Sequence, residues 1–236
     1  MNTLINYPLP DWIAYAFLMV IFIPSIMIAF LAKKGLNNSN TIFYKTLAFF
    51  VIYFIYVTIT CNLGLFNRVF LPPLVLLYCT FPLALFLFTV AINLKIYKLF
   101  LDNIQLESLV SIHIFRLIGV FFLLLAFYDS LPKFFAIIAG TGDMITAITS
   151  IFVAKSIREQ KPYAKKLTLI WNSFGFLDIL FTAVTAILLT KLSIDKGTMG
   201  VDTLARFPFC FIPAFAPPII IFLHVSIFKK IKKTFS

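Results

Sequence analysis

Six polar side chains stand in stretches that are otherwise almost entirely apolar: His113, Arg116, Asp143, Asn172, Asp178 and His224. Ionisable groups inside an apolar helix are costly when unpaired, so they turn toward the interior of a bundle and mark candidate functional sites. One arginine and two aspartates predict a buried ion pair of Arg116 with either Asp143 or Asp178. The other carboxylate is then left over, without a cation.

Two interpretations of this cluster stay open at the level of sequence. A buried carboxylate that lacks a cation can exchange protons, which favours a proton- or ion-linked binding site. In that case Asp143 or Asp178 takes up the proton, and Arg116 is its counter-charge or contacts an anion. The alternative is a structural clamp, since membrane helices are often joined by hydrogen bonds between polar side chains.

The elements that position these side chains follow from composition. The chain has 236 residues, of which 61% are hydrophobic and 12% charged. A water-soluble fold of this size cannot bury so much apolar surface, and the same composition excludes disorder. Continuous apolar runs of about 18 residues or more are typical of membrane-spanning helices. Seven such runs are present, at approximately Trp12–Leu31, Thr46–Phe66, Leu74–Leu94, Leu109–Tyr128, Phe134–Ala154, Leu167–Thr190 and Phe207–Phe228.

The basic residues are unevenly divided between the two sides of these runs. The connections on one side carry 14 lysines and arginines, and those on the other side carry 5. The positive-inside rule then predicts an N-terminus outside and a C-terminus in the cytoplasm. The same basic connections account for the net charge of +11, and they are expected to face the anionic lipid of the cytoplasmic side. Since no basic patch is interleaved with aromatic residues, we expect no nucleic-acid partner.

Three segments predict departures from a plain helical bundle. Ala139–Asp143 is rich in small residues, and Pro213, Pro217 and Pro218 lie in the last apolar run. Helices that are broken near charged residues form substrate sites in many transporters, so the Pro217-Pro218 pair is a candidate gate. A kink that merely improves packing is the alternative. The mixed stretch Lys95–Glu107 either lies along the membrane interface or extends the fourth helix into water.

Two short segments resemble motifs of a known class of membrane enzyme. Gly140–Asp143 matches the GxGD signature of intramembrane aspartyl proteases, and Tyr128-Asp129 resembles their Tyr-Asp motif. Catalysis there needs two carboxylates close enough to share a proton. Asp129 is expected at the outer end of its helix, at a different depth from Asp143. Asp178 is a better geometric partner, but its surroundings depart from that family.

Cofactor chemistry finds little support. The last apolar run has no lysine for a retinal Schiff base. His113 and His224 are expected at compatible depths, yet two histidines alone are weak evidence for haem and too few for a zinc hydrolase. We therefore assign no catalytic residue, no metal and no cofactor, and the sequence does not predict an enzyme.

The stretch from Arg116 to Asp178 resembles an uncharacterised group of small bacterial multi-pass membrane proteins. The resemblance rests on four motifs, which cover about a quarter of the chain: Arg116 with Gly119, Leu131-Pro132 with Phe135-Ala136, Ala139-Gly140-Thr141-Gly142-Asp143, and Trp171-Asn172 with Gly175 and Asp178. It implies a location in the bacterial cytoplasmic (inner) membrane. It implies no activity, but it singles out the same polar positions.

We thus expect an all-α fold, a bundle of seven transmembrane helices forming one integral membrane domain over residues 1–236. The leading hypothesis is a small-solute or ion transporter that a proton can drive. The alternatives are a non-enzymatic assembly or sensor component, and, with less support, the intramembrane protease. The expected partners are the lipid bilayer and a small solute or ion, and no protein partner is identified.

Overall fold

Seven helical segments of the chain are long and apolar enough to cross a membrane. The computed structural model describes residues 9–235. Within these residues the seven segments are Asp11–Gly35, Asn40–Asn62, Leu76–Asn93, Leu106–Phe127, Lys133–Arg158, Ala164–Lys196 and Phe211–Thr234. The all-α class and the number of span-length apolar helices are confirmed for the described residues, and the expected ends differ by at most six residues. The N-terminal tail over residues 1–8, which we expected outside the membrane, lies outside the described residues.

The segments are built from α-helices with several stretches of 3-10 and π geometry. In chain order the elements are α1 (Asp11–Val20), α2 (Ile23–Gly35), α3 (Asn40–Asn62), η1 (Leu76–Thr80, π), α4 (Phe81–Leu85), η2 (Phe86–Val90, π), η3 (Ala91–Asn93, 3-10), α5 (Lys95–Asn103), α6 (Leu106–Ser111), η4 (Ile112–Gly119, 3-10), α7 (Val120–Phe127), α8 (Lys133–Arg158), α9 (Ala164–Lys196), η5 (Asp202–Ala205, 3-10) and α10 (Phe211–Thr234). Sequence periodicity locates such a span but does not report its hydrogen-bond pattern.

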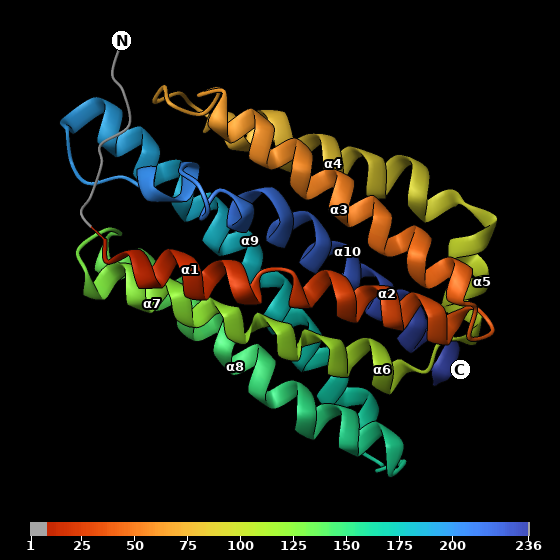
Figure 1. Ribbon diagram of the computed structural model, residues 1–236. Helices are drawn as coiled ribbons and strands as arrows, with labels where there is room; N and C mark the ends of the chain where they lie inside the picture. Colours follow the sequence, from red (N-terminus) through yellow and green to blue (C-terminus); the bar gives the residue numbers. More distant parts are fainter. Residues whose placement is uncertain (1–8, 236) are drawn as a thin grey trace.

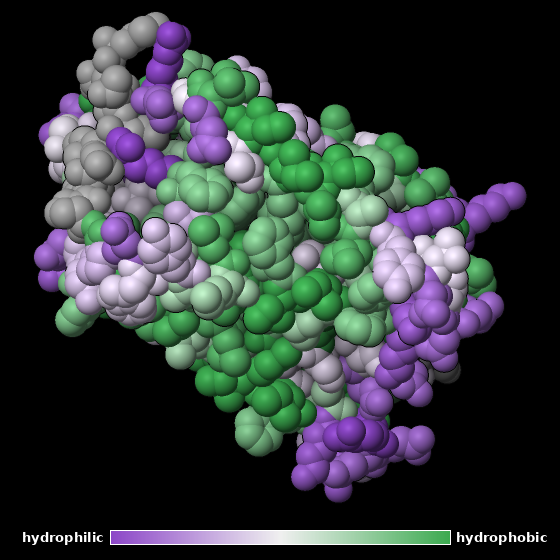
Figure 2. Space-filling view, viewed as in Figure 1, coloured by the Kyte–Doolittle hydropathy of each residue, from purple (hydrophilic) through white to green (hydrophobic). Residues whose placement is uncertain are grey.

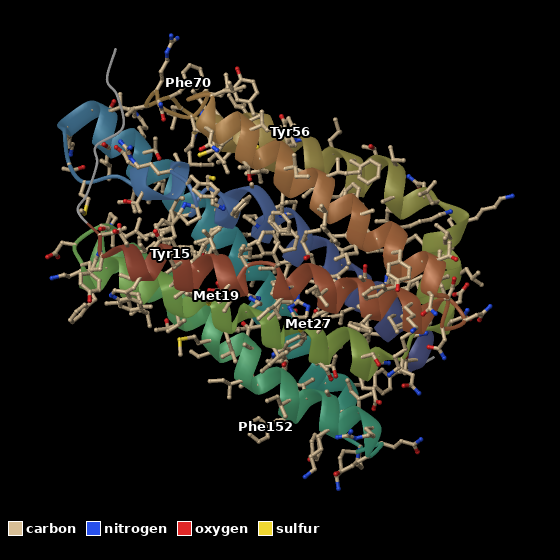
Figure 3. All side chains as sticks on the ribbon, in the orientation of Figure 1. Tyr15, Met19, Met27, Tyr56, Phe70 and Phe152 are labelled. Atoms are coloured by element: carbon tan, nitrogen blue, oxygen red, sulfur yellow. The ribbon has the colours of Figure 1, made fainter. Side chains whose placement is uncertain are left out.

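The long helices run side by side between two ends of an elongated bundle (Figure 1). α10 is the central element, because it packs against α3, η1 and α4 as well as against α6 and α9. α8 packs against α9 and against the span formed by α6, η4 and α7. Apolar residues cover the middle of the visible face and hydrophilic residues gather toward its ends (Figure 2). Large side chains such as Met19 and Phe152 point outward from this middle zone (Figure 3). This surface fits a multi-pass membrane protein.

The basic connections meet at one end of the bundle. Lys34 at the end of α2 donates to the Ser108 hydroxyl of α6 at 2.8 Å. Lys230 of α10 donates to the carbonyls of Leu101 and Asp102, both at 2.9 Å, and so caps the C-terminal end of α5. Lys233 hydrogen-bonds the Asp102 carboxylate, and this contact holds the pKa of that carboxyl below its usual value.

The stretch Lys95–Glu107 does not extend the fourth span. α5 is a separate helix, because Leu94 before it and Ile104 after it have extended backbone. It buries Tyr97 and Leu101 and leaves Lys95 and Lys98 exposed. The fourth span itself begins at Leu106. The second of the two alternatives is therefore wrong, and an amphipathic helix against α2 and α10 is what remains.

The expected breaks at Ala139–Asp143 and Pro217-Pro218 are absent. α8 and α10 both run as continuous α-helices through these positions. The prolines remove the bonds that would reach the carbonyls of Pro213 and Ala214, four residues back. The Thr80 hydroxyl donates to the Pro213 carbonyl at 2.6 Å, and the Tyr53 hydroxyl donates to that of Ala214 at 2.9 Å. Hydroxyls from η1 and α3 thus replace both lost hydrogen bonds.

These two hydroxyls make a testable contribution to stability. Tyr53→Phe and Thr80→Val each remove one hydroxyl donor. Each change therefore leaves one α10 carbonyl, of Ala214 or Pro213, without that hydrogen bond. Interhelical hydrogen bonds in membrane proteins contribute about 0.6–2 kcal/mol, so each variant should unfold at a lower temperature in detergent than the parent chain. Tyr44→Phe is the matched control, because Tyr44 is 66% exposed. Equal melting temperatures for Tyr53→Phe and Tyr44→Phe would contradict the capping role.

Candidate functional site

The irregular element η4 sets the direction of the central arginine. In a 3-10 helix residues i and i+3 eclipse one another, whereas in an α-helix they are offset by about 60°. His113, Arg116 and Gly119 therefore form one straight stripe along η4, and all three are buried. η4 packs against α8, and these three buried residues face the interior of the bundle. The 3-10 geometry therefore aligns His113 with Arg116 more closely than an α-helix would.

Arg116 joins three other helices through its guanidinium group. Nε donates to Asp143 Oδ1 of α8 at 2.6 Å, and Nη2 donates to Asp178 Oδ2 of α9 at 2.6 Å. Nη1 donates to the Gly175 carbonyl of α9 at 3.2 Å and lies 3.1 Å from Nε2 of His224 on α10. The Arg116 side chain has no exposed surface. Our expectation that one carboxylate would be left over is wrong, because both pair with the same arginine.

The hydrogen bonds assign the tautomer of His224. A guanidinium nitrogen can only donate, so Nε2 of His224 accepts from Arg116. The proton of the neutral ring then lies on Nδ1, which is 2.8 Å from the Asn172 Oδ1 acceptor. Asn172 in turn donates from Nδ2 to the His224 carbonyl at 3.1 Å. His224 is thus neutral in this arrangement, and protonation of Nε2 would place two cations in contact.

The Trp-Asn-x-x-Gly-x-x-Asp stretch forms the inner face of α9. The Trp171 indole donates to the Thr146 carbonyl of α8 at 3.1 Å. Asn172 bonds α10, and Gly175 and Asp178 bond Arg116. Residues at i, i+3 or i+4 and i+7 share one side of an α-helix. The spacing therefore places every polar partner of this motif on the side that faces the cluster.

Glycines make room for the charged groups. A Cβ at Gly119 would lie 2.5 Å from the Asp143 Cβ, and one at Gly142 would lie 1.8 Å from Asp178 Oδ1. A Cβ at Gly175 would lie 2.7 Å from His224 Cε1. Each glycine thus clears the position of a different member of the network. The requirement is steric, because all three are in helices and none has positive φ.

His113 lies beside the cluster without joining its hydrogen bonds. Its ring is completely buried, and neither ring nitrogen has a hydrogen-bond partner among the described residues. The ring packs edge-on against Trp171, with centroids 5.2 Å apart, and its centroid lies 4.3 Å from that of His224. Two rings this close leave no room for a porphyrin between them. Of the six residues singled out from the sequence, the structure joins five by hydrogen bonds and places His113 against them.

The charges of the cluster do not cancel. With both carboxylates ionised, Arg116 contributes one positive charge, the two aspartates contribute two negative charges, and His224 is neutral. Asp178 is the one cluster member that lines any of five hollows on the described residues. That hollow lies on the outer side of α9, between Phe174, Leu177 and Phe181. The site is therefore closed around Arg116 and borders the surface at Asp178.

The geometry differs from that of an aspartyl protease dyad. Asp143 and Asp178 bond different nitrogens of one guanidinium, whereas a dyad shares a proton between two carboxylates. Asp129 of the Tyr-Asp pair lies in the turn before α8, where its exposed carboxylate is 3.5 Å from Lys133. It takes no part in the cluster.

Tyr53 and Thr80 are the positions that sequence reasoning missed, and it assigned no role to the three glycines. A signal for the hydroxyls was present, because Pro217 and Pro218 necessarily free the carbonyls of Pro213 and Ala214. Nothing in the sequence showed which helix would supply the donors. For the glycines the motifs marked the positions, but only the packing of the helices identifies the neighbour of each.

One comparison with known proteins gave a match. A family model described as "Domain of unknown function (DUF8737)" matches residues 72–231. This is more than half of the chain and includes all six polar residues, so the chain belongs to that family. Searches among curated proteins and among solved structures gave no match.

Gly142→Ala tests the fit between α8 and α9. The added methyl group would overlap Asp178 Oδ1, so either α9 moves away or the carboxylate leaves Arg116. Overpacking of this kind typically costs about 1–3 kcal/mol, and the melting temperature in detergent should fall accordingly. Thr141→Ala, at an exposed position on the same helix, is the control. The loss should largely vanish in an Asp178→Ala background, and an equal loss in both backgrounds would contradict the contact.

Proposed function

We propose that this member of the DUF8737 family is a multi-pass membrane transporter of a small solute or ion, and that its transport is linked to a proton. The observation that carries the proposal is the buried cluster of one arginine and two aspartates, which holds one uncompensated negative charge when both carboxylates are ionised. An isolated charge is expensive to bury in an apolar interior. Uptake of one monovalent cation makes the cluster neutral, and a proton needs the least space.

Asp178 is the group proposed to exchange this proton. It borders a hollow on the outer side of α9, whereas Arg116 lies wholly inside the bundle. Once protonated, the Asp178 carboxyl holds the guanidinium less strongly, because an ion pair becomes a hydrogen bond to a neutral acceptor. An anionic or polar group of the solute can then compete with Asp178 for the Nη2 donor of Arg116. Proton uptake and solute binding would in this way favour one another.

The proposed moving element is η4. A stretch of 3-10 helix within a longer span often marks a hinge, and this one carries both His113 and Arg116. A return of η4 to α geometry would rotate Arg116 relative to His113 and alter its contacts with α9. The Pro217-Pro218 pair is not proposed as the gate, because α10 is continuous there and both freed carbonyls have hydroxyl donors.

A structural role is the second candidate, and it rests on a different observation. Four contacts occupy the guanidinium group of Arg116, and none of the five described hollows reaches it. Such a paired cluster is also what a clamp between four helices requires. In that case the chain would be an assembly or sensor component that acts through helix contacts. Co-purification of a stoichiometric partner, with no flux by the isolated protein, would favour this role.

Flux measurements separate the two candidates. The protein is reconstituted into liposomes loaded with a pH-sensitive dye, and Na⁺, K⁺, amino acids, sugars and organic anions are added in turn under an imposed pH gradient. We expect at least one of these solutes to drive proton movement in the parent protein. Asp143→Asn and Asp178→Asn should each reduce that movement to the level of empty liposomes. Asp195→Asn is the control, because this exposed carboxylate pairs with Lys191 at the far end of α9.

Two results of this experiment would overturn the transport proposal. One is flux that survives in both Asp143→Asn and Asp178→Asn. The other is the absence of flux for every solute, together with capture of a stoichiometric protein partner.

The proposed location is the bacterial cytoplasmic membrane, with the N-terminus outside and the C-terminus inside. The basic end of the bundle supports this orientation, because lysine and arginine are retained on the cytoplasmic side. Asp129 and Glu159 lie in the turns at opposite ends of α8, and both side chains are exposed. Acidic residues contribute little to orientation, so replacing them by cysteine should leave it unchanged.

Cysteine labelling tests the orientation directly. The native Cys61, Cys79 and Cys210 are all buried, which keeps the background low. A membrane-impermeant maleimide should label Asp129→Cys in intact cells and Glu159→Cys only after lysis. The reverse pattern would show that the bundle is inserted the other way round.

A further inference from the structure

A hollow at the basic end of the bundle lies where α2, α6 and α8 meet. Three charged side chains line it, and they are Lys34 of α2, Glu107 of α6 and Arg158 of α8. Lys34 is held by its 2.8 Å hydrogen bond to the Ser108 hydroxyl, which keeps its own hydrogen for another acceptor. Arg158 makes no ion pair or side-chain hydrogen bond with any described residue. The hollow thus has a net positive charge and at least one cation that is free to bind a ligand.

The positive charge continues on both sides of this hollow. A neighbouring hollow shares Lys34 and adds Lys33, and a second one shares Arg158 and adds Lys230. Both lie along the connection between α5 and α6, near Ile104. An anion bound between Lys34 and Arg158 would therefore lie in a field that is positive on either side, with Glu107 as the one carboxylate in the hollow.

Apolar side chains lie deeper on the same two helices. Met27 precedes Lys34 by seven residues on α2, and Ile151 precedes Arg158 by seven on α8. Seven residues of α-helix rise about 10 Å, so each helix offers a cation at the rim and an apolar side chain two turns further in. Met27 lies on the side of α2 that faces α6 (Figure 3). Phe30 and Ile151 are each 55% exposed along this path.

We propose that the hollow between α2, α6 and α8 binds an anionic phospholipid, with its phosphate between Lys34 and Arg158 and an acyl chain over Met27, Phe30 and Ile151. Cations at the headgroup level and apolar side chains about 10 Å deeper match the two parts of such a lipid. A soluble phosphate would use only the first part. The site is independent of the Arg116 cluster, so it does not rest on the transport proposal.

Native mass spectrometry of the purified protein tests the site. Phosphatidylglycerol, phosphatidylethanolamine and phosphatidylcholine are titrated separately, and bound lipids are counted. We expect phosphatidylglycerol to bind most tightly. Since each basic residue near a lipid phosphate contributes about 1 kcal/mol, the double variant Lys34→Gln/Arg158→Gln should bind it roughly thirtyfold more weakly. Lys161→Gln/Lys166→Gln is the matched control, because these lysines are at the same end but outside the hollow.

Two further variants and a competitor sharpen the test. Glu107→Gln should strengthen phosphatidylglycerol binding, because it removes the one carboxylate from the hollow. Ile151→Ser should weaken it, and an excess of glycerol phosphate should not displace the lipid. Arg158→Gln alone leaves the Lys34–Ser108 contact between α2 and α6 intact. Weaker lipid binding by this single variant could therefore not be attributed to the loss of that contact. Equal binding of the three lipids, equal losses in the two double variants, or displacement by glycerol phosphate would each overturn the proposal.

Discussion

The structure depends on one interaction, the contact of the Arg116 guanidinium with two aspartates inside an apolar bundle. The guanidinium cannot lose its proton, so it must be surrounded by acceptors wherever it is buried. Asp143, Asp178, the Gly175 carbonyl and His224 supply them from α8, α9 and α10. Removing water from these charges is costly, and only this complete set of partners offsets the cost. The relative positions of four helices are thereby linked to one side chain.

The requirement to surround Arg116 accounts for other features of the bundle. The 3-10 geometry of η4 aligns Arg116 with Gly119, whose missing side chain lets Asp143 approach. Gly142 and Gly175 do the same for Asp178 and His224. Nearer the start of α10, the Tyr53 and Thr80 hydroxyls donate to the carbonyls that Pro217 and Pro218 leave without their helical partners. α10 is thus held at two places, by the hydrogen bond from Arg116 to His224 and by hydroxyls from the first half of the chain.

The sequence was sufficient to predict the seven span-length helices and most members of the buried cluster. A long apolar run predicts a membrane helix because backbone N–H and C=O groups in lipid must bond one another, and a helix satisfies them within one segment. Arg116, Asp143 and Asp178 were found because charged groups are rare in such runs and must meet one another. The pairing of both aspartates with one arginine was not predicted, because the sequence argument assigned a single carboxylate to each cation. A guanidinium has five N–H groups and can serve both.

The local backbone was the part that sequence predicted worst. Pro217-Pro218 and Ala139–Asp143 suggested breaks, yet α10 and α8 are continuous, while the irregular geometry is in η4 and in the Leu76–Asn93 span. Proline in a helix removes a hydrogen bond, but whether the helix breaks depends on donors from elsewhere, here Tyr53 and Thr80. Those contacts join segments that lie 133 and 161 residues apart. Such information is in the tertiary packing and not in the local sequence.

Comparing Arg116→Met with the triple variant Arg116→Met/Asp143→Asn/Asp178→Asn tests the central interaction most directly. Thermal unfolding of both is measured in the same detergent as the parent protein. Removing the arginine alone leaves two buried carboxylates without a cation, so a loss of about 3–5 kcal/mol is predicted. The triple variant removes the charges together and should recover most of that stability. Equal stability of the single and triple variants, or no loss in the single variant, would contradict the account.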